Sequence, residues 1–348
     1  MENKKRNIAI DILKFFAVLL ITNSHFDEQY VHFKELATGG AIGDALFFFC
    51  SGYTLFLGRL GSFDTWYKRR IRRIYPSVFG LGIIVFFFYG VNFRLSELLT
   101  NGAGWFVSCI MIYYVALYFI KKYWVDNLRL IYFLVTIVIL AWYILFFEPF
   151  NTWFRINCDN LSWMLFCQPM DIVWIYQWNY FKWGFFFLFM LMGADIGLRE
   201  VAYQKKGSKS FTPVLVRLIF SCIVFYAIPL ASIKYPFFQN VLILSLIPLT
   251  LICIYFYQLC QTNVMVTIYN HRISGWIIKV ISGLCLEIYL VQPFVRTTAL
   301  NHLFPFNLLI LFVAIVVVAY ICRVIGRLFQ QTFSSEDGYD WKSILKII

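Results

Sequence analysis

Residues 8–26, IAIDILKFFAVLLITNSHF, decide the fold, because this apolar run has the length of a membrane helix yet carries ionisable side chains. A helix needs about 20 apolar residues to cross a bilayer. Asp11 and Lys14 are three positions apart and are therefore neighbours on a helix surface. Lys14 and His25 are eleven positions apart, which places them on one face, roughly 16 Å apart along the axis. Ionisable groups are costly inside a membrane, so all three are candidates for function.

Structural explanations of these three residues stay open. Asp11 and Lys14 could form an ion pair, and the Lys14 ammonium could reach the headgroups along its aliphatic stem. His25 could cap the helix or face water outside the membrane.

Composition places the whole chain in a membrane. Of its 348 residues, 61% are hydrophobic and 14% are charged, whereas a soluble domain is about 45–50% apolar and about 25% charged. No polar stretch is long enough for a soluble domain, so residues 1–348 are expected to form a single integral-membrane domain with a short tail from about 330. We predict an all-α, polytopic bundle of about ten helices. The predicted segments are 8–26, 41–60, 74–93, 105–121, 128–148, 181–198, 213–233, 237–259, 276–297 and 303–329.

The Lys and Arg residues predict the orientation, because cytoplasmic loops are enriched in them. With the N-terminus in the cytoplasm, six of the 30 basic residues lie outside and Lys14 lies within the first segment. The other 23 lie inside or at inner helix ends. Both termini are then cytoplasmic, in a multi-pass protein of the inner or plasma membrane. Topology alone thus accounts for the net charge of +12, and no nucleic-acid partner is expected.

Two short stretches around the second predicted segment indicate ligand binding. In residues 67–76, YKRRIRRIYP, the basic residues 68–73 are expected in a cytoplasmic loop, and Pro76 is expected in the first turn of the third segment, where proline is tolerated. Membrane anchoring accounts for some of these charges, but arginine also pairs with phosphate through a bidentate fork. Ser51 and Gly52 offer a small surface that a slender ligand, or simply another helix, can approach closely. The candidate phosphate-binding residues are Arg69, Arg70, Arg72 and Arg73.

The longest predicted outside segment, 148–180, is rich in Trp, Asn, Asp and Gln. These side chains are typical of carbohydrate sites, although an interfacial aromatic belt has a similar composition. Cys158 and Cys167 lie in this segment and could form a disulfide in an oxidising compartment. The nine cysteines show no metal-binding spacing, and no metal is expected.

Four motifs, in their order and spacing, resemble acyltransferase family 3, integral-membrane enzymes that O-acetylate surface polysaccharides. In the family, the first motif is an acidic residue followed by Arg or Lys and, after ten intervening residues, His. The second motif is G-x-x-x-F-F-x-x-S-G. The third is R-x-x-R followed by an aliphatic residue, one further residue and Pro, and the fourth is Trp-Phe. The chain departs from the family at Lys14, where Arg is commoner, at Asp44, where an apolar residue is usual, and at Gln292, where His is common. The matching residues are Asp11, Lys14 and His25; Gly43, Phe47, Phe48, Ser51 and Gly52; Arg70, Arg73, Ile74 and Pro76; and Trp105 with Phe106.

The resemblance implies transfer of an acyl group, expected to be acetyl, from cytoplasmic acyl-CoA to a hydroxyl of a cell-surface or lipid-linked glycan. The arginines and Ser51 would hold acetyl-CoA, and His25 would act as general base or carry the acyl group covalently. Lys14 and Asp11 would position the first helix or the donor. Glu287, in the ninth segment, would orient His25, or it is a packed polar residue with its own partner. The expected partners are the glycan, acyl-CoA, the bilayer and polysaccharide-biosynthesis proteins.

A secondary transporter and a flippase for lipid-linked sugar are the alternative functions. A transporter also has about ten helices and buried charge, but it often shows inverted repeats and matching broken helices. The sequence shows neither feature. A flippase is expected to be longer and to carry more charge in a central cavity.

Overall fold

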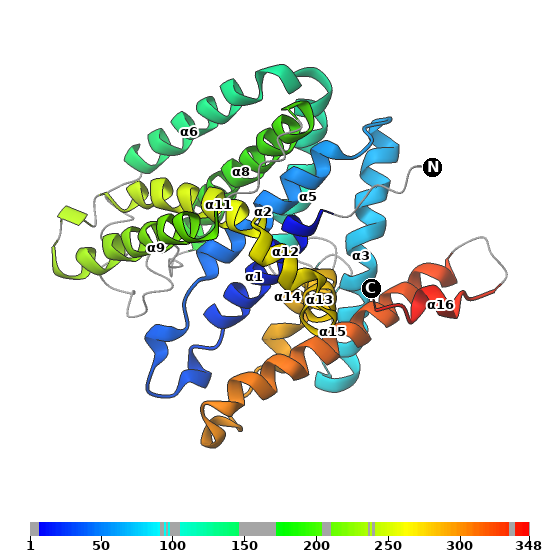
Figure 1. The fold of residues 1–348 in the computed structure, drawn as a ribbon. Helices are drawn as coiled ribbons and strands as arrows, with labels where there is room; N and C mark the ends of the chain where they lie inside the picture. Colours follow the sequence, from blue (N-terminus) through cyan, green and yellow to red (C-terminus); the bar gives the residue numbers. More distant parts are fainter. Residues whose placement is uncertain are drawn as a thin grey trace. The chain divides into compact units, whose positions relative to one another are not determined.

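The computed structural model describes residues 7–90, 94, 97, 105–145, 172–203, 210–235, 237–238, 241–333 and 338–347. These residues form α-helices joined by turns and short 3-10 helices, and they contain no strand (Figure 1), which confirms the predicted all-α bundle. The helices are α1 (Ile8–Ser24), α2 (Gly40–Leu57), α3 (Phe63–Tyr89), α5 (Trp105–Tyr123), α6 (Leu128–Leu145), α8 (Ile172–Tyr203), α9 (Phe211–Lys234), α11 (Leu246–Cys260), α12 (Asn263–Asn270), α13 (Arg272–Gly283), α14 (Cys285–Val295), α15 (Phe306–Thr332) and α16 (Trp341–Ile344).

Eight of the described helices are each long and apolar enough to cross a membrane, as a multi-pass membrane protein requires. The pair α13 and α14 is also long and apolar enough, but it is bent by 76°. α1 has 17 residues, so it is about 26 Å long against a hydrocarbon core of about 30 Å. With α1, these helices correspond to the ten predicted segments.

The start of the third helix was predicted wrongly. α3 begins at Phe63, eleven residues earlier than expected, so the basic stretch lies on a helix and not in a loop. Ser62 caps this helix by accepting a backbone N–H at 3.4 Å, and Asp64 lies in the first turn, where negative charge is favoured. Trp66 is fully buried and gives the new first turns a packing surface. Pro76 consequently lies inside α3, not in its first turn.

The ninth predicted segment, 276–297, is not one helix. It is broken at Leu284 into α13 and α14, and the chain bends by 76° between them. The dipeptide Ser282-Gly283 directly precedes the break, and such pairs favour interruption of a helix. The break places Glu287 in the first turn of a new helix.

Two further helix boundaries also differ from the prediction. The segment expected at 237–259 begins at Leu242 with a 3-10 turn that continues into α11. α8 begins at Ile172, so the last residues of the predicted loop 148–180 are helical. Residues 146–171, with Cys158 and Cys167, lie outside the described residues.

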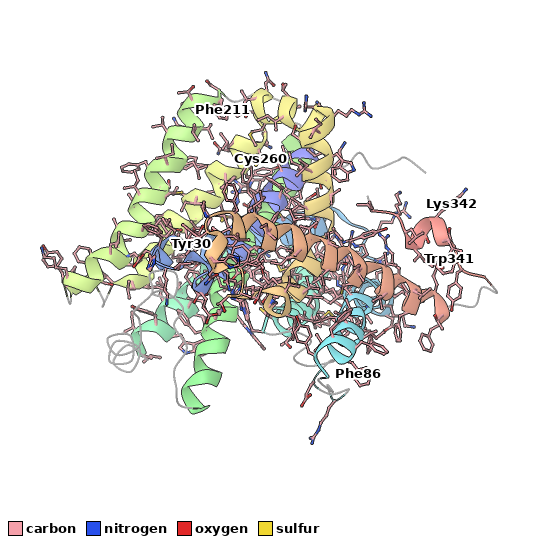
Figure 2. The ribbon with its side chains drawn as sticks, turned by 90° about the horizontal axis from the view of Figure 1, so that it is seen from below. Tyr30, Phe86, Phe211, Cys260, Trp341 and Lys342 are labelled. Carbon is pink, nitrogen blue, oxygen red and sulfur yellow. The ribbon has the colours of Figure 1, made fainter. Side chains whose placement is uncertain are left out.

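Residues 338–347 of the C-terminal tail are among the described residues. α15 extends to Thr332, and α16 then packs against it. The Arg327 guanidinium donates to the backbone carbonyl of Ser343 at 2.9 Å, and Ile344 is fully buried. Trp341 and Lys342 lie on α16 beside the end of α15 (Figure 2), with Trp341 57% exposed.

Contacts divide the chain into two compact units, so the single domain over 1–348 stays a prediction. Unit 1 comprises Met1–His25, Phe33–Gly58 and Asp126–Ile278, and unit 2 comprises Phe26–His32, Arg59–Val125 and Lys279–Ile348. In unit 1, α2 packs along α8 and α1, and α9 packs on α11. In unit 2, α15 packs along α3 and α14 (Figure 1).

Glycines bring helix backbones into direct contact in each unit. In unit 1, a Cβ atom added to Gly52 would lie 1.8 Å from a carbonyl oxygen of α8, and one added to Gly193 would lie 2.0 Å from a carbonyl oxygen of α2. In unit 2, a Cβ atom added to Gly80 of α3 would lie 2.5 Å from a carbonyl oxygen of α15, and one added to Gly326 of α15 would lie 2.5 Å from a carbonyl oxygen of α3. Such close approach is typical of membrane helices. Gly52 therefore serves helix packing, and the predicted contact of Ser51 with the donor stays a prediction.

Candidate active site

His25 forms the C-terminal cap of α1 and is partly exposed. Its backbone N–H donates to the carbonyl of Thr22 at 3.1 Å. Lys14, also partly exposed, lies on the same helix, which is unbroken from Lys14 to Ser24, so the predicted spacing of roughly 16 Å holds. The C-terminal end of a helix carries partial negative charge. His25 therefore lies at the end of α1 where the last backbone carbonyls concentrate partial negative charge.

Gly40 and Gly43, in the first turn of α2, explain how this helix fits against the end of α1. A Cβ atom at Gly43 would lie 2.6 Å from the Ile21 side chain, and one at Gly40 would lie 2.6 Å from Ser24 Oγ. Any larger residue would push α2 away from α1. The family-like glycine at position 43 thus fixes the surroundings of the helix turn just before His25.

Asp11 is 6% exposed and accepts a hydrogen bond from the Tyr269 hydroxyl of α12 at 2.8 Å. Buried carboxylates need such donors, because an unpaired one is strongly disfavoured. The contact ties the start of α1 to α12 within unit 1. The sequence did not indicate Tyr269 as its partner, and the positioning role of Asp11 stays a prediction.

A second polar cluster of unit 1, around Glu200 of α8, was missed by the sequence analysis. The predicted segment 181–198 ended two residues before Glu200, so this residue was not placed on a helix. A carboxylate so close to the end of an apolar segment was the signal that could have indicated a buried polar residue. The Glu200 carboxylate accepts three hydrogen bonds, and the cluster holds α1, α2, α8 and α11 together. The donors to its carboxylate are Tyr53 Oη at 2.8 Å, Tyr257 Oη at 2.5 Å and Gln261 Nε2 at 2.5 Å, and Asn7 Nδ2 donates to Tyr53 Oη at 2.8 Å.

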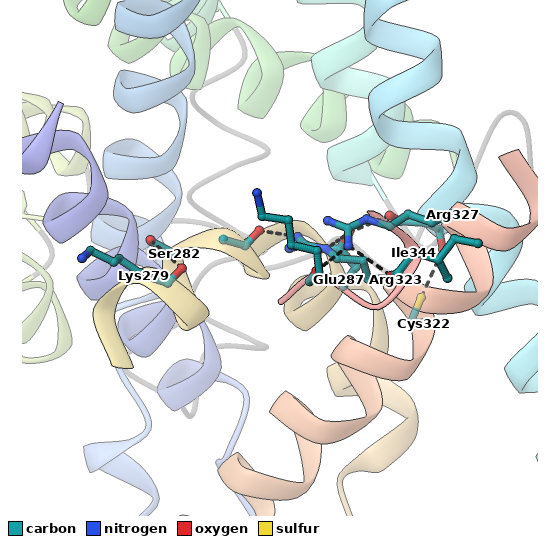
Figure 3. Close-up of polar contacts among 10 residues, drawn as sticks. Lys279, Ser282, Glu287, Cys322, Arg323, Arg327 and Ile344 are labelled. Atoms are coloured by element: carbon teal, nitrogen blue, oxygen red, sulfur yellow. Dashed lines mark hydrogen bonds and ion pairs between the residues drawn. The ribbon is translucent and has the colours of Figure 1, made fainter. Parts of the chain in front are cut away.

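Glu287 is 4% exposed and lies within a polar cluster of unit 2 (Figure 3). Its carboxylate accepts two bonds from Arg323, Nε at 3.1 Å and Nη2 at 2.6 Å, and one from Ser77 Oγ at 2.7 Å. Arg323 also donates to the Gly283 carbonyl at the α13–α14 break. These contacts match the alternative of a packed polar residue with its own partners, while an orienting role toward His25 stays a prediction.

The four predicted arginines do different things on α3. Arg69 Nη2 donates to the carbonyls of Arg59 and Leu60, both at 3.0 Å, and so closes the turn between α2 and α3. Arg70 is partly buried, with its guanidinium carbon 4.3 Å from the centre of the Trp66 ring. Arg72 and Arg73 are exposed.

The comparison with protein families matches residues 7–327 to a family described as an acyltransferase domain. This range includes all the predicted site residues, from Asp11 to Glu287. The comparisons with curated proteins and with solved structures found no match.

Proposed function

The chain belongs to acyltransferase family 3, and from this premise we propose that it transfers an acyl group, acetyl in the first instance, from acyl-CoA to a hydroxyl group of a cell-surface or lipid-linked glycan. The family match over residues 7–327 is the observation that carries the proposal. We further propose that both termini are cytoplasmic, that the protein lies in the inner or plasma membrane, and that it works with polysaccharide-biosynthesis proteins.

His25 is the proposed general base. Its imidazole takes the proton from the acceptor hydroxyl as that oxygen attacks the thioester carbonyl. A C–O bond forms, the C–S bond breaks, and the coenzyme A thiolate leaves and is protonated by the imidazolium. The end of α1 supports this role, because its partial negative charge stabilises the imidazolium formed on the way.

The donor side of the proposal uses the basic face of α3, with Arg70 and Arg73 as phosphate ligands and Arg69 and Arg72 nearby. Ser51 would contact the donor. Asp11, through its bond to Tyr269, would hold the part of α1 that carries Lys14.

The test uses the full chain in lipid nanodiscs with radiolabelled acetyl-CoA and surface polysaccharide from host cells that lack the protein. We expect label in the polysaccharide, released by mild base as an O-ester should be. Mass spectrometry should find these acetyl groups on polysaccharide from cells that contain the protein and should not find them on polysaccharide from cells that lack it. Polysaccharide that stays unlabelled although the folded protein is present would contradict the proposal and leave transport as the alternative function.

His25→Gln tests the base directly, because glutamine keeps a polar group of similar reach but has no basic nitrogen. Turnover should fall by roughly 10²–10⁴-fold, the usual contribution of general acid–base catalysis, while the donor KM stays nearly the same. His32→Gln is the matched control, because His32 is exposed. Near-normal turnover in a folded His25→Gln variant would make His25 a structural cap.

A further inference from the structure

Trp66 and Tyr114 form a rigid aromatic platform between α3 and α5. Trp66 is fully buried, and its indole N–H donates to the Tyr114 carbonyl at 3.1 Å, which fixes the ring plane. The Arg70 guanidinium carbon lies 4.3 Å from the centre of the Trp66 ring and 5.7 Å from that of Tyr114. Cation–π attraction at these distances holds the guanidinium in one orientation.

Arg70 differs from its neighbour Arg69 in how its N–H groups are used. Arg69 donates to two carbonyls of the turn before α3. Arg70 Nε is buried and has no hydrogen-bond partner among the described residues. A buried N–H without an acceptor costs free energy, which an acceptor group would recover. Arginine presents its donors in a planar fork that fits phosphate oxygens.

Lys121 brings a second cation to the platform from α5. Its ammonium lies 5.7 Å from the centre of the Trp66 ring, and the side chain is partly buried in the last turn of the helix. The next residue, Lys122, is exposed and lies over Tyr118 and Tyr123 instead. Adjacent lysines therefore serve different surfaces, and only one of these two contacts Trp66.

Arg73 adds a third positive charge. It follows Arg70 by three positions, so both lie on the Trp66 face of α3. Like charges this close repel one another. Within the described part of the chain, no carboxylate forms an ion pair with Arg70 or Arg73. An anion with more than one negative charge would relieve that repulsion.

We propose that Lys121, which lies on the same Trp66 ring as Arg70, is a further ligand of the acyl-CoA phosphate groups that the proposed function assigns to Arg70 and Arg73. The identity of the ligand rests on the proposed function, whereas the geometry stands on its own. In the sequence, membrane topology alone accounted for the positive charge of Lys121. The proposal gives this side chain a second role, as a ligand of the donor. An anionic lipid headgroup presents the same phosphate chemistry, and the experiment must separate the two sources.

The experiment measures coenzyme A binding by calorimetry to the full chain in nanodiscs of neutral phosphatidylcholine. Lys121→Gln should weaken binding about tenfold or more, as expected for loss of a hydrogen bond to a charged group. Lys121→Arg, which keeps the charge, should restore most of the affinity. Lys122→Gln, the matched control, should bind within about twofold of wild type. A second arm repeats the titrations in nanodiscs with anionic lipid.

Equal affinities for Lys121→Gln and Lys122→Gln, with wild type binding coenzyme A, would overturn the inference and leave the proposed function standing. An effect of Lys121→Gln that appears only in nanodiscs with anionic lipid would also overturn it, because Lys121 would then act through a lipid headgroup. Lys121-dependent coenzyme A binding without acyl transfer would support the site and reject the proposed function.

Discussion

Replacing Arg323 alone should destabilise the protein more than replacing Arg323 and Glu287 together. In the wild type, the buried Glu287 carboxylate accepts bonds from Arg323 at 3.1 and 2.6 Å and from Ser77 at 2.7 Å. Arg323→Met leaves that carboxylate with the Ser77 hydroxyl as its remaining donor in this set. In Arg323→Met with Glu287→Leu, both charges are gone and two apolar side chains of similar volume face each other.

The size of the effect follows from the burial of Glu287, which is 4% exposed. Removing one partner of a buried ion pair costs about 3–5 kcal/mol, because the other charge stays buried without compensation. Replacing both partners by apolar groups is often close to neutral. The Ser77 hydroxyl then loses its acceptor, which adds about 1–3 kcal/mol. Arg323→Met and the double variant both lose the Arg323 bond to the Gly283 carbonyl, so the double variant should lose less stability than Arg323→Met alone.

Thermal unfolding in detergent, followed with a thiol-reactive dye, measures this difference. Cys322 is fully buried, and its Sγ donates to the Ser77 carbonyl at 3.3 Å. In a background in which the other eight cysteines are replaced by alanine, its labelling reports separation of α3 from α15. Additive losses in the double variant would refute the reasoning. Acyl transfer by the folded double variant then tests Glu287 itself: normal turnover assigns it to packing, and lost turnover at full stability restores the orienting role.

Two other substitutions test the packing of each unit in the same unfolding assay. Gly193→Ala would place a Cβ atom 2.0 Å from a carbonyl oxygen of α2, so we expect a melting temperature lower by several degrees or no folded protein; Gly338→Ala, with no atom within 4 Å, should match wild type. Asn307→Ala removes a fully buried donor to the Gln29 carbonyl at 2.9 Å and should cost about 1–3 kcal/mol. An unchanged melting temperature in either test variant would contradict the packing described here.

The sequence predicted the helical bundle because apolar runs of membrane length have few alternatives to a helix in lipid. It failed at the start of α3, where the run of lysine and arginine resembled a cytoplasmic loop. The missed signal was local: Ser62 before the helix and Asp64 in its first turn are a common helix start. The charge pattern indicated topology, but the cap and Trp66 determined the structure.

The break between α13 and α14 was also beyond the hydropathy pattern, because both halves are apolar and together are long enough to span. Ser282-Gly283 offered a weak hint. What compensates for the break is a tertiary contact: Arg323 of α15 donates to the Gly283 carbonyl. A window of sequence around the break does not contain this arginine.

Partner choice among buried charges explains why the site was only partly predictable. Hydropathy shows that Asp11 and Glu287 are costly to bury in a membrane. Their hydrogen-bond donors, Tyr269 and Ser77, are 258 and 210 positions away in the sequence. Many hydroxyl groups on other helices would satisfy a carboxylate equally well, so the sequence does not identify these donors. Once these donors are known, the two acids have contacts that hold helices together. His25 differs from them, because it is partly exposed and lies at the C-terminal end of α1. A residue that must accept and return a proton needs that access, so burial favours His25 over the two acids as the base.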